Sequence, residues 1–254
     1  KFMSSSSNNK KRYIESAPLH IDVENFKSVV KSRRSVRKFT DKAIPADVLN
    51  DCLDLALLAP NSSNLQPWTF YVVKTESKKQ TLIKACLNQW AARTAAELIV
   101  CVARTDRLDE MAKRNINEFP FPEVPPLVKK YYTYIPYNYK TGLFNTIGHF
   151  KKVTFKVARQ LGKQLPVTAF KPEDSILWAT KTTALACENL VLALRAHGFD
   201  SCMMEGFDEP LVRKALNLGD QQYPIMVIGA GERAEDGVFF PQYRFDRKLF
   251  IQEV

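Results

Sequence analysis

Apolar and polar side chains follow two periods along this chain of 254 residues. Apolar positions three and four residues apart are typical of amphipathic helices, whereas short runs of apolar and β-branched residues are typical of buried strands. The helical period predicts helices over 23–31, 48–56, 174–197 and 208–216. The short apolar runs predict strands over 68–73, 97–103, 199–204 and 224–228. Helices and strands alternate, so the pattern predicts a mixed α and β fold.

A pair of glycines follows the last predicted strand, in the run Gly229-Ala230-Gly231-Glu232-Arg233-Ala234. This run matches the glycine-rich turn of dinucleotide-binding folds, which also needs a following helix, a second strand and an acidic residue about 20 residues further on. Only 23 residues follow Gly231, and they show little helical period. We therefore interpret the glycines as the exit of a strand. No P-loop, HExxH or GxSxG motif occurs, which argues against NTPases and hydrolases.

The segment over about 105–172 differs from the rest of the chain. It contains seven prolines, Pro120, Pro122, Pro125, Pro126, Pro136, Pro166 and Pro172. A basic piece over 150–163 is a candidate helix within it. We predict that the segment is an insertion or lid within a single domain over 18–254. Residues 1–17 are rich in Ser, Asn and Lys, and we predict a disordered leader there.

The composition narrows the class of protein further. No run approaches the about 18 consecutive apolar residues of a membrane-spanning helix, and we expect no membrane partner. The five cysteines are an odd number, lack the spacing of a metal site and each lie in an apolar stretch. This usage is typical of buried thiols in a reducing compartment. Because we find no export signal, we expect a cytoplasmic protein, and we expect no bound metal.

The net charge of +10 is concentrated in two segments. Residues 1–40 carry ten basic and three acidic residues, whereas residues 129–163 carry eight basic residues and no acidic one. The second segment also holds eight aromatic residues, a combination that single-stranded nucleic acid binding uses. The alternative, which we prefer, is a lid whose aromatic rings pack over a cleft while its lysines face water.

The basic turn over 33–37 carries more specific chemistry. Its guanidinium groups and the Ser35 hydroxyl place several donors within five residues, a set that suits a phosphate dianion. About 25 residues further on, the loop over 60–68 is rich in Asn, Ser and Gln. Their side chains pair donors with acceptors, which suits the edge of a heteroaromatic ring or a polyol chain. Each segment alone is also consistent with an ordinary solvated turn.

These two segments, in this order, resemble those of the flavin-dependent nitroreductases. The resembling pieces are RRSVRKF (33–39), LLAPNSSNLQPWTFYVV (57–73), the NQ pair (88–89), DSCMMEGFD (200–208) and GVFFPQYRFDRKLF (237–250). Together they span most of 23–104 and 173–254, whereas 105–172 is not covered. The resemblance implies an α+β fold with a central, mostly antiparallel sheet flanked by helices. It also implies a homodimer with FMN at the subunit interface.

The resemblance further implies which residues bind FMN. The first basic motif of the family binds the flavin phosphate and ring, a role that falls here to Arg33, Arg34, Ser35 and Arg37. Arg37 would lie nearest the N1/C2=O edge, where positive charge stabilises the anionic reduced flavin. The loop residues Pro60, Asn61, Ser62, Asn64 and Gln66 would contact the FMN bound by the other chain. The remaining implied ligands are Asn88, Met204, Glu205, Gly206 and Arg244, while Gln242 replaces a lysine of some relatives.

The chemistry implied by the resemblance is that of a ping-pong oxidoreductase. NAD(P)H passes a hydride to flavin N5 and leaves, and an electron-poor acceptor such as a nitroaromatic or a quinone takes the electrons in the same space. Because the cofactor carries the chemistry, we expect no catalytic side chain beyond the FMN ligands. Cations of 129–163 are candidates to hold the 2′-phosphate of NADPH. Reductive dehalogenation is an alternative within the family, and a nucleic-acid-binding protein is the alternative outside it.

Overall fold

The structure, a computed structural model, describes residues 13, 15–17 and 20–254. Most of the predicted leader over 1–17 lies outside the described residues. No helix within the described ranges is both long enough and apolar enough to cross a membrane.

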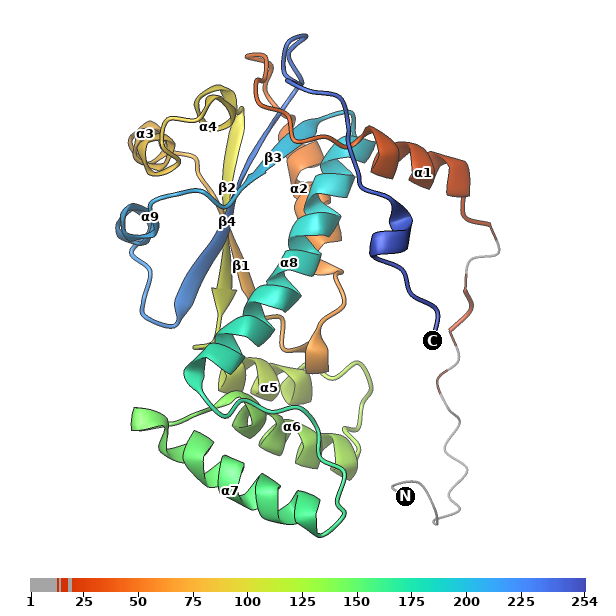
Figure 1. Cartoon of the computed structure of the whole chain (residues 1–254), viewed down its shortest axis with the longest axis vertical. Helices are drawn as coiled ribbons and strands as arrows, with labels where there is room; N and C mark the ends of the chain where they lie inside the picture. Colours follow the sequence, from red (N-terminus) through yellow and green to blue (C-terminus); the bar gives the residue numbers. More distant parts are fainter. Residues whose placement is uncertain (1–12, 14, 18–19) are drawn as a thin grey trace.

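A four-stranded sheet forms the centre of the molecule (Figure 1). Its strands are β1 (Trp68–Val72), β2 (Glu97–Arg104), β3 (Asp200–Met204) and β4 (Gln222–Gly231). They lie in the order β1-β2-β4-β3, and all three neighbouring pairs are antiparallel. All four predicted strands are therefore present, and the expected α+β class with an antiparallel sheet is confirmed.

Five helices cover the two faces of this sheet (Figure 1). One face carries α3 (Glu76–Ala85), α4 (Trp90–Thr94) and α9 (Glu209–Leu216), and the other carries α2 (Ala46–Leu57) and α8 (Pro172–Ala196). Successive side chains of β2 point to opposite faces of the sheet, so this strand packs against both groups of helices. Leu98, Val100 and Val102 pack with the first group of helices, whereas Ile99 and Cys101 pack with the second.

The boundaries of the long helix α8 follow from local chemistry. Pro172 stands in its first turn, where a missing N–H costs nothing. The Asp174 carboxylate accepts the N–H groups of Phe170 at 2.9 Å and of Lys171 at 3.1 Å. Just beyond its last residue, Gly198 adopts a φ of +85°, the left-handed conformation that commonly ends helices. The four predicted helices are confirmed, with ends displaced by at most two residues.

Strand β4 continues through the glycine pair and ends at Gly231, so the predicted strand exit at this run is confirmed, three residues after the predicted strand end at 228. A Cβ at Gly229 would stand 2.8 Å from the carbonyl oxygen of Ala91, and one at Gly231 would stand 3.0 Å from Cβ of Phe39. The glycines therefore allow α4 and the chain after the basic turn to approach the sheet closely.

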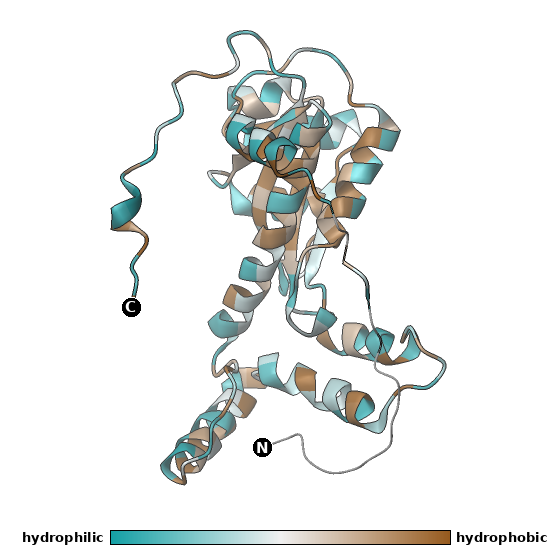
Figure 2. Cartoon of the chain, turned by 90° about the vertical axis from the view of Figure 1, so that its right-hand side faces the viewer, coloured by the Kyte–Doolittle hydropathy of each residue, from teal (hydrophilic) through white to brown (hydrophobic). Residues whose placement is uncertain are grey.

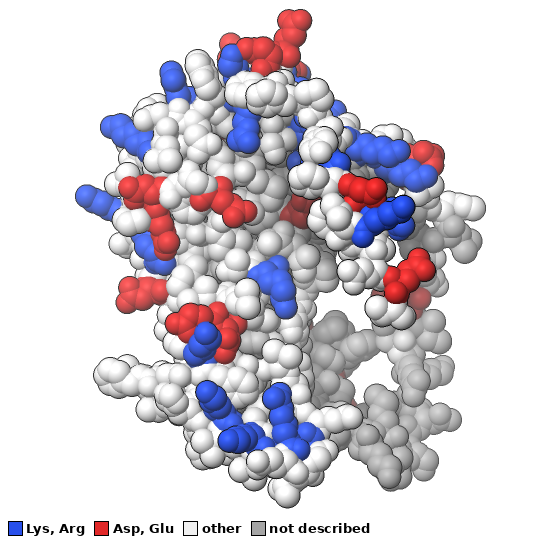
Figure 3. Space-filling view, viewed as in Figure 1, with Lys and Arg blue, Asp and Glu red and all other residues white. Residues whose placement is uncertain are grey.

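The segment over 105–172 forms a separate layer of helices at the lower end of the molecule (Figure 1), which we call the helical layer. Its helices are α5 (Leu108–Asn117), α6 (Pro126–Tyr139) and α7 (Thr146–Gln160). Leu108, Ala112 and Ile135 join Trp178 of α8 in one hydrophobic cluster. Figure 3 shows basic side chains over α7 with no acidic ones among them. The role of the layer as an insertion or lid stays a prediction.

The two ends of the described chain leave apolar side chains exposed. Helix α1 (Val23–Ser32) has no buried residue, and its Val23 and Phe26 are exposed. The tail over 241–254 runs away from the rest of the molecule (Figure 2) and exposes Phe245 and Phe250. This chain alone therefore leaves apolar surface at both ends in contact with water.

Candidate active site

The basic turn lies beside the start of β3, where backbone hydrogen bonds hold it. The Val36 N–H donates to Ser201 O at 3.0 Å, and the Arg37 N–H donates to Gly237 O at 2.7 Å. Val36 is fully buried, so its neighbours Ser35 and Arg37 face the opposite side of this extended segment. The fold thus directs a hydroxyl and a guanidinium group out of the core.

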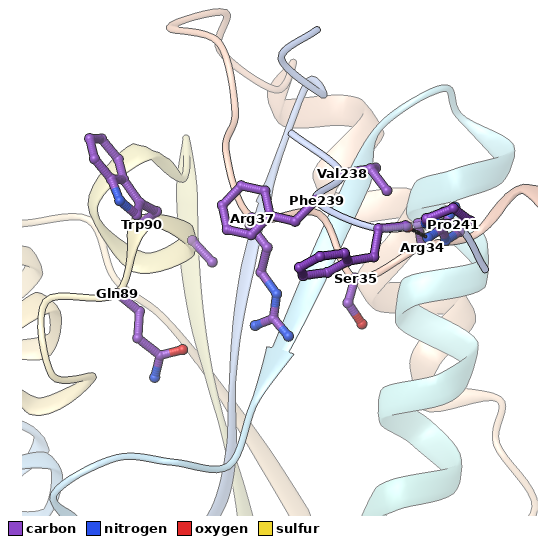
Figure 4. Close-up of a pocket in the computed structure, with 10 residues that line it drawn as sticks. Arg34, Ser35, Arg37, Gln89, Trp90, Val238, Phe239 and Pro241 are labelled. Atoms are coloured by element: carbon purple, nitrogen blue, oxygen red, sulfur yellow. Dashed lines mark hydrogen bonds between the residues drawn. The ribbon is translucent and has the colours of Figure 1, made fainter. Parts of the chain in front are cut away.

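A cavity of about 520 Å³ lies beside this turn (Figure 4). Figure 4 shows Gln89 and Trp90 on one side of Arg37 and the segment 238–241 on the other. The lining residues are Arg34, Ser35, Arg37, Gln89, Trp90, Ala91, Val238, Phe239, Phe240 and Pro241. Aromatic and apolar walls with a few polar groups are typical of a site for a flat ring with polar edges.

Two arginines of the turn are held by specific contacts. Arg34 Nη2 donates to Phe240 O at 2.5 Å, and Arg37 Nη1 donates to the Cys202 sulfur at 3.3 Å. Burial raises the pKa of the Cys202 thiol, and the Arg37 guanidinium opposes this shift. The thiol is therefore neutral near pH 7, so it places no negative charge beside the Arg37 guanidinium.

A smaller cavity of about 280 Å³ adjoins the first and shares Arg34, Ser35 and Pro241 with it. Its other lining residues include Arg33, Gln242 and Arg244. Three guanidinium groups around one small cavity form a donor set for a phosphate. The structure thus brings the predicted Arg33, Arg34, Ser35 and Arg244 together from two ends of the chain.

The chain after α3 brings an amide to the larger cavity. Gln89 lines it, and Gln89 Nε2 donates to Gly206 O at 3.0 Å. The predicted Asn88 has a φ of 54° and is not among the lining residues. Met204, the last residue of β3, is buried, whereas Glu205 and Gly206 after it are exposed. The structure therefore places Gln89 of the NQ pair at the cavity and ties Gly206 to it.

The loop after α2 lies far from the basic turn, beside the helical layer (Figure 1). Helix α2 has 12 residues, a length of about 18 Å that separates the two segments. The Ser62 hydroxyl bonds the Tyr139 hydroxyl at 3.1 Å. Pro60, Asn61 and Ser62 line a cavity of about 680 Å³, and Asn64 and Gln66 line another of about 310 Å³. Within one chain, the predicted FMN ligands therefore form two separate groups.

Three aromatic side chains at the 520 Å³ cavity beside the basic turn were not predicted, namely Trp90, Phe239 and Phe240. Trp90 is half exposed, and Lys38 Nζ and Arg93 Cζ lie 5.1 and 4.8 Å from its ring centroid. Their positions in the sequence could have indicated them, because Trp90 follows the NQ pair and both phenylalanines lie in the segment 237–250 that resembles the family. Sequence alone does not tell such exposed rings from ordinary surface residues.

Comparison with known proteins decides the family. The sequence model described as "Nitroreductase family" matches residues 30–232. The chain belongs to the nitroreductase family. An NADH dehydrogenase from Thermus thermophilus is 27% identical over 224 residues, which cover 88% of this chain and 93% of that protein. A chloronitrobenzene nitroreductase from Comamonas testosteroni is 25% identical over 213 residues, which cover 80% and 84%.

Solved structures share the architecture of this nitroreductase-family chain. A nitroreductase family protein from Streptococcus pneumoniae aligns with a TM-score of 0.66 at 24% identity, covering 90% of this chain and 100% of that one. A protein from Exiguobacterium sibiricum, solved in complex with FMN, aligns with a TM-score of 0.64 at 21% identity, covering 90% and 97%. The predicted nitroreductase-like fold and the assignment to an oxidoreductase family are confirmed.

Proposed function

We propose that this protein is an FMN-dependent oxidoreductase that transfers hydride from NAD(P)H to electron-poor acceptors, such as nitroaromatics and quinones, by a ping-pong mechanism. The pair of adjoining cavities at the basic turn carries the proposal. One is lined by three arginines and the other by aromatic walls with Arg37 and an amide. FMN has the same two parts, a phosphate and a flat ring with polar edges. The NADH dehydrogenase among the relatives and the FMN complex among the solved structures support the same reading.

The residues present fit FMN chemically. Arg33, Arg34 and Arg244 would hold the phosphate. Their three positive charges would suffice, although Gln242 stands where some relatives have a lysine. Gln89 and Arg37 would meet the polar edge of the ring between aromatic walls. When bound, FMN supplies the two-electron chemistry that links NAD(P)H to the acceptor.

The chain itself contributes a fixed charge to this chemistry. Arg37 is half-buried and held by its backbone and by Cys202. A preorganised positive charge stabilises the negative charge that a flavin gains on reduction. No Asp, Glu or His lines this cavity among the described residues. This supports the proposal that no side chain acts as a catalytic acid or base.

The working enzyme is a homodimer in this proposal, with each FMN held between two chains. The loop residues Pro60, Asn61, Ser62, Asn64 and Gln66 lie apart from the basic turn of their own chain, so a second copy would supply them. The exposed apolar side chains of α1 and of the tail support an interface of this kind. The site is therefore incomplete in a single chain.

The helical layer is a lid in this proposal, and nucleic acid binding stays the alternative outside the family. Two of its aromatic residues, Tyr132 and Tyr139, pack inside the layer. Tyr139 stacks on Trp178 with ring centroids 4.0 Å apart. These two rings do not offer faces to nucleotide bases, whereas Tyr134, Phe144 and Phe150 of the same segment are exposed. Reductive dehalogenation stays an alternative acceptor chemistry, and the five free, buried thiols support a cytoplasmic location.

The visible absorption spectrum of the purified protein tests this function. We expect a yellow protein whose flavin absorbance is lost under anaerobic NADH or NADPH and is restored by the neutral acceptor 4-nitrobenzamide. Light scattering should give twice the chain mass of 29.0 kDa. A colourless protein that cannot be loaded with FMN would contradict the proposal, and a monomer that binds FMN tightly would contradict the shared site.

A pair of arginine variants tests the phosphate site. Arg244→Gln should weaken FMN binding about tenfold, the value of one charge-assisted hydrogen bond. Arg247→Gln, in the same tail but outside the cavity, should leave FMN binding unchanged. Fluorescence titration of each apoprotein with FMN measures the two dissociation constants. Equal losses in both variants would show a general effect of charge and not a phosphate site.

A further inference from the structure

Helix α7 lies on the side of the helical layer that faces away from the sheet (Figure 1). Only Gly148 and Lys151 of this helix are buried. Lys151 Nζ donates to three backbone carbonyls at the end of α6, so polar contacts hold the helix in place. Most helices gain stability in proteins by burying an apolar face, whereas α7 leaves a line of apolar side chains in water.

This exposed line, which we call the apolar strip, runs along one side of α7. It consists of Phe150, Val153, Val157 and, directly after the helix, Leu161, each at least 50% exposed. Side chains three and four residues apart fall on the same side of a helix. The apolar strip is therefore continuous over about 16 Å.

A line of cations runs along the same helix. Lys152, Lys156 and Arg159 are exposed and lie about 140° around the helix from the centre of the apolar strip. No acidic residue occurs over 129–163, and basic side chains cover α7 without acidic neighbours in Figure 3. A partner that complements both lines offers apolar material next to negative charge.

An anionic membrane surface offers this combination. Interfacial helices bury apolar side chains at the boundary of headgroups and acyl chains, while Lys and Arg meet the anionic headgroups. Such a helix lies in the plane of the membrane. The expectation of no membrane partner rested on the lack of a spanning segment, which an interfacial helix does not need.

The composition of the apolar strip favours lipid over two other partners. Single-stranded nucleic acid stacks its bases on aromatic rings, and Phe150 is the one aromatic member of the strip. A second copy of α7 packed against the first would bring two lines of like charge together, which opposes association. An anionic lipid surface meets the apolar strip and the cations at the same time.

We infer that α7 is an interfacial helix by which the helical layer docks on anionic phospholipid membranes, with the apolar strip inserted at the headgroup boundary and the line of cations beside the lipid phosphates. This inference goes beyond the proposed function and does not depend on it, since it needs neither FMN nor an acceptor.

Sedimentation with lipid vesicles tests the docking. The purified protein should bind vesicles of phosphatidylcholine with about one-third phosphatidylglycerol, and it should bind vesicles of phosphatidylcholine alone about tenfold more weakly. Val153→Gln/Val157→Gln should weaken binding to the anionic vesicles about tenfold, because it removes two apolar side chains from the contact. Both positions are exposed, so the circular dichroism spectrum should not change.

A pair of lysine variants separates the cations of α7 from the net charge of the protein. Lys152→Gln/Lys156→Gln should weaken binding to the anionic vesicles about tenfold. Lys78→Gln/Lys84→Gln removes the same charge from exposed positions of α3 and should leave binding unchanged. Equal losses in the two variants would overturn the inference in favour of a general effect of charge.

A fluorescent side chain locates the contact on the molecule. The emission of Phe150→Trp should shift to shorter wavelength when anionic vesicles are added, because the ring leaves water, whereas Leu211→Trp at an exposed position of α9 should show no shift. No binding to anionic vesicles, or binding without a shift in Phe150→Trp, would overturn the inference. So would binding to a single-stranded oligonucleotide alone. A changed light-scattering mass in Val153→Gln/Val157→Gln would also overturn it, because α7 would then be an interface between copies of the chain.

Discussion

The sheet core is stabilised by apolar packing, whereas α7 of the helical layer is fixed mainly by polar contacts. In the core, fully buried apolar residues such as Ile99, Leu190 and Ile228 pack together. In the layer, Lys151 of α7 is only 1% exposed. Its Nζ donates to Tyr137 O and Asn138 O, both at 3.1 Å, and to Lys140 O at 2.8 Å.

The carbonyls that Lys151 meets lie at the end of α6, where a helix leaves backbone oxygens without partners and where a cation is favoured. Thr168 Oγ1 also donates to Asn138 O, at 2.7 Å, and Ser175 Oγ donates to Tyr139 O. A few directional donors therefore fix α6 against α7 and α8. Because polar contacts are directional and apolar packing is not, these hydrogen bonds fix the orientation of the helices as well as their separation.

The largest effect we expect comes from a cavity in the core. Leu190→Ala removes a fully buried side chain of α8 and should lower the free energy of unfolding by about 3 kcal/mol. Chemical denaturation followed by circular dichroism measures this loss. If the core is one cooperative unit, amide hydrogen exchange in the Leu190→Ala variant should be faster throughout the sheet. Faster exchange confined to α8 would contradict a single cooperative core.

Removing the buried lysine should loosen the layer and spare the core. Lys151→Met removes the Lys151 donor from the Tyr137 and Lys140 carbonyl oxygens, while Asn138 O keeps the Thr168 hydroxyl, and the cost should be about 2 kcal/mol. We expect faster hydrogen exchange in α6 and α7 with little change in the four strands. Lys152→Met, at the exposed neighbouring position, is the control and should change neither region. Equal acceleration in strands and layer would show that the two regions are not independent.

The bond between the Ser62 and Tyr139 hydroxyls joins the loop after α2 to the layer. Ser62→Ala and Tyr139→Phe should each cost about 1 kcal/mol or less, as expected for a partly exposed neutral hydrogen bond. Their double-mutant cycle should show coupling because both variants remove the same bond. Additive losses would mean that the hydroxyls act separately.

The smallest effect is the pH dependence of the core thiols. Burial raises the pKa of the Cys86 thiol from 9.0 to about 11. The unfolded chain therefore releases this proton first as pH rises, so stability decreases from about pH 9 toward pH 11. Between pH 7 and 9 the loss should be about 0.4 kcal/mol for this thiol. Denaturation at both pH values checks it, and Cys86→Ala should show a shallower decrease than the wild type.

Several features of the candidate site could be predicted from the sequence because they depend on residues close together along the chain. The arginines of the basic turn stand within five residues of each other, so their chemistry is visible without a fold. The choice between Asn88 and Gln89 was not readable in this way. Leu87 and Asn88 both have positive φ values, which turn the backbone just before Gln89. This turn decides that Gln89 and not Asn88 lines the cavity. Lys151 likewise looked like any other cation of its segment, because only burial distinguishes it.

The sequence by itself determined four helices, four strands and a mixed α and β class through its hydrophobic period, while the antiparallel sheet was implied by the resemblance of its short motifs to the nitroreductases. It also determined the kind of ligand that the basic turn suits, since charge and hydrogen-bonding capacity belong to residue types. Only the tertiary structure decided which residues meet. Helix α2 is a rigid rod of 12 residues, about 18 Å long, and it holds the loop after it away from the basic turn. The separation of the predicted FMN ligands into two groups is thus a matter of distance in space, which spacing along the chain does not contain.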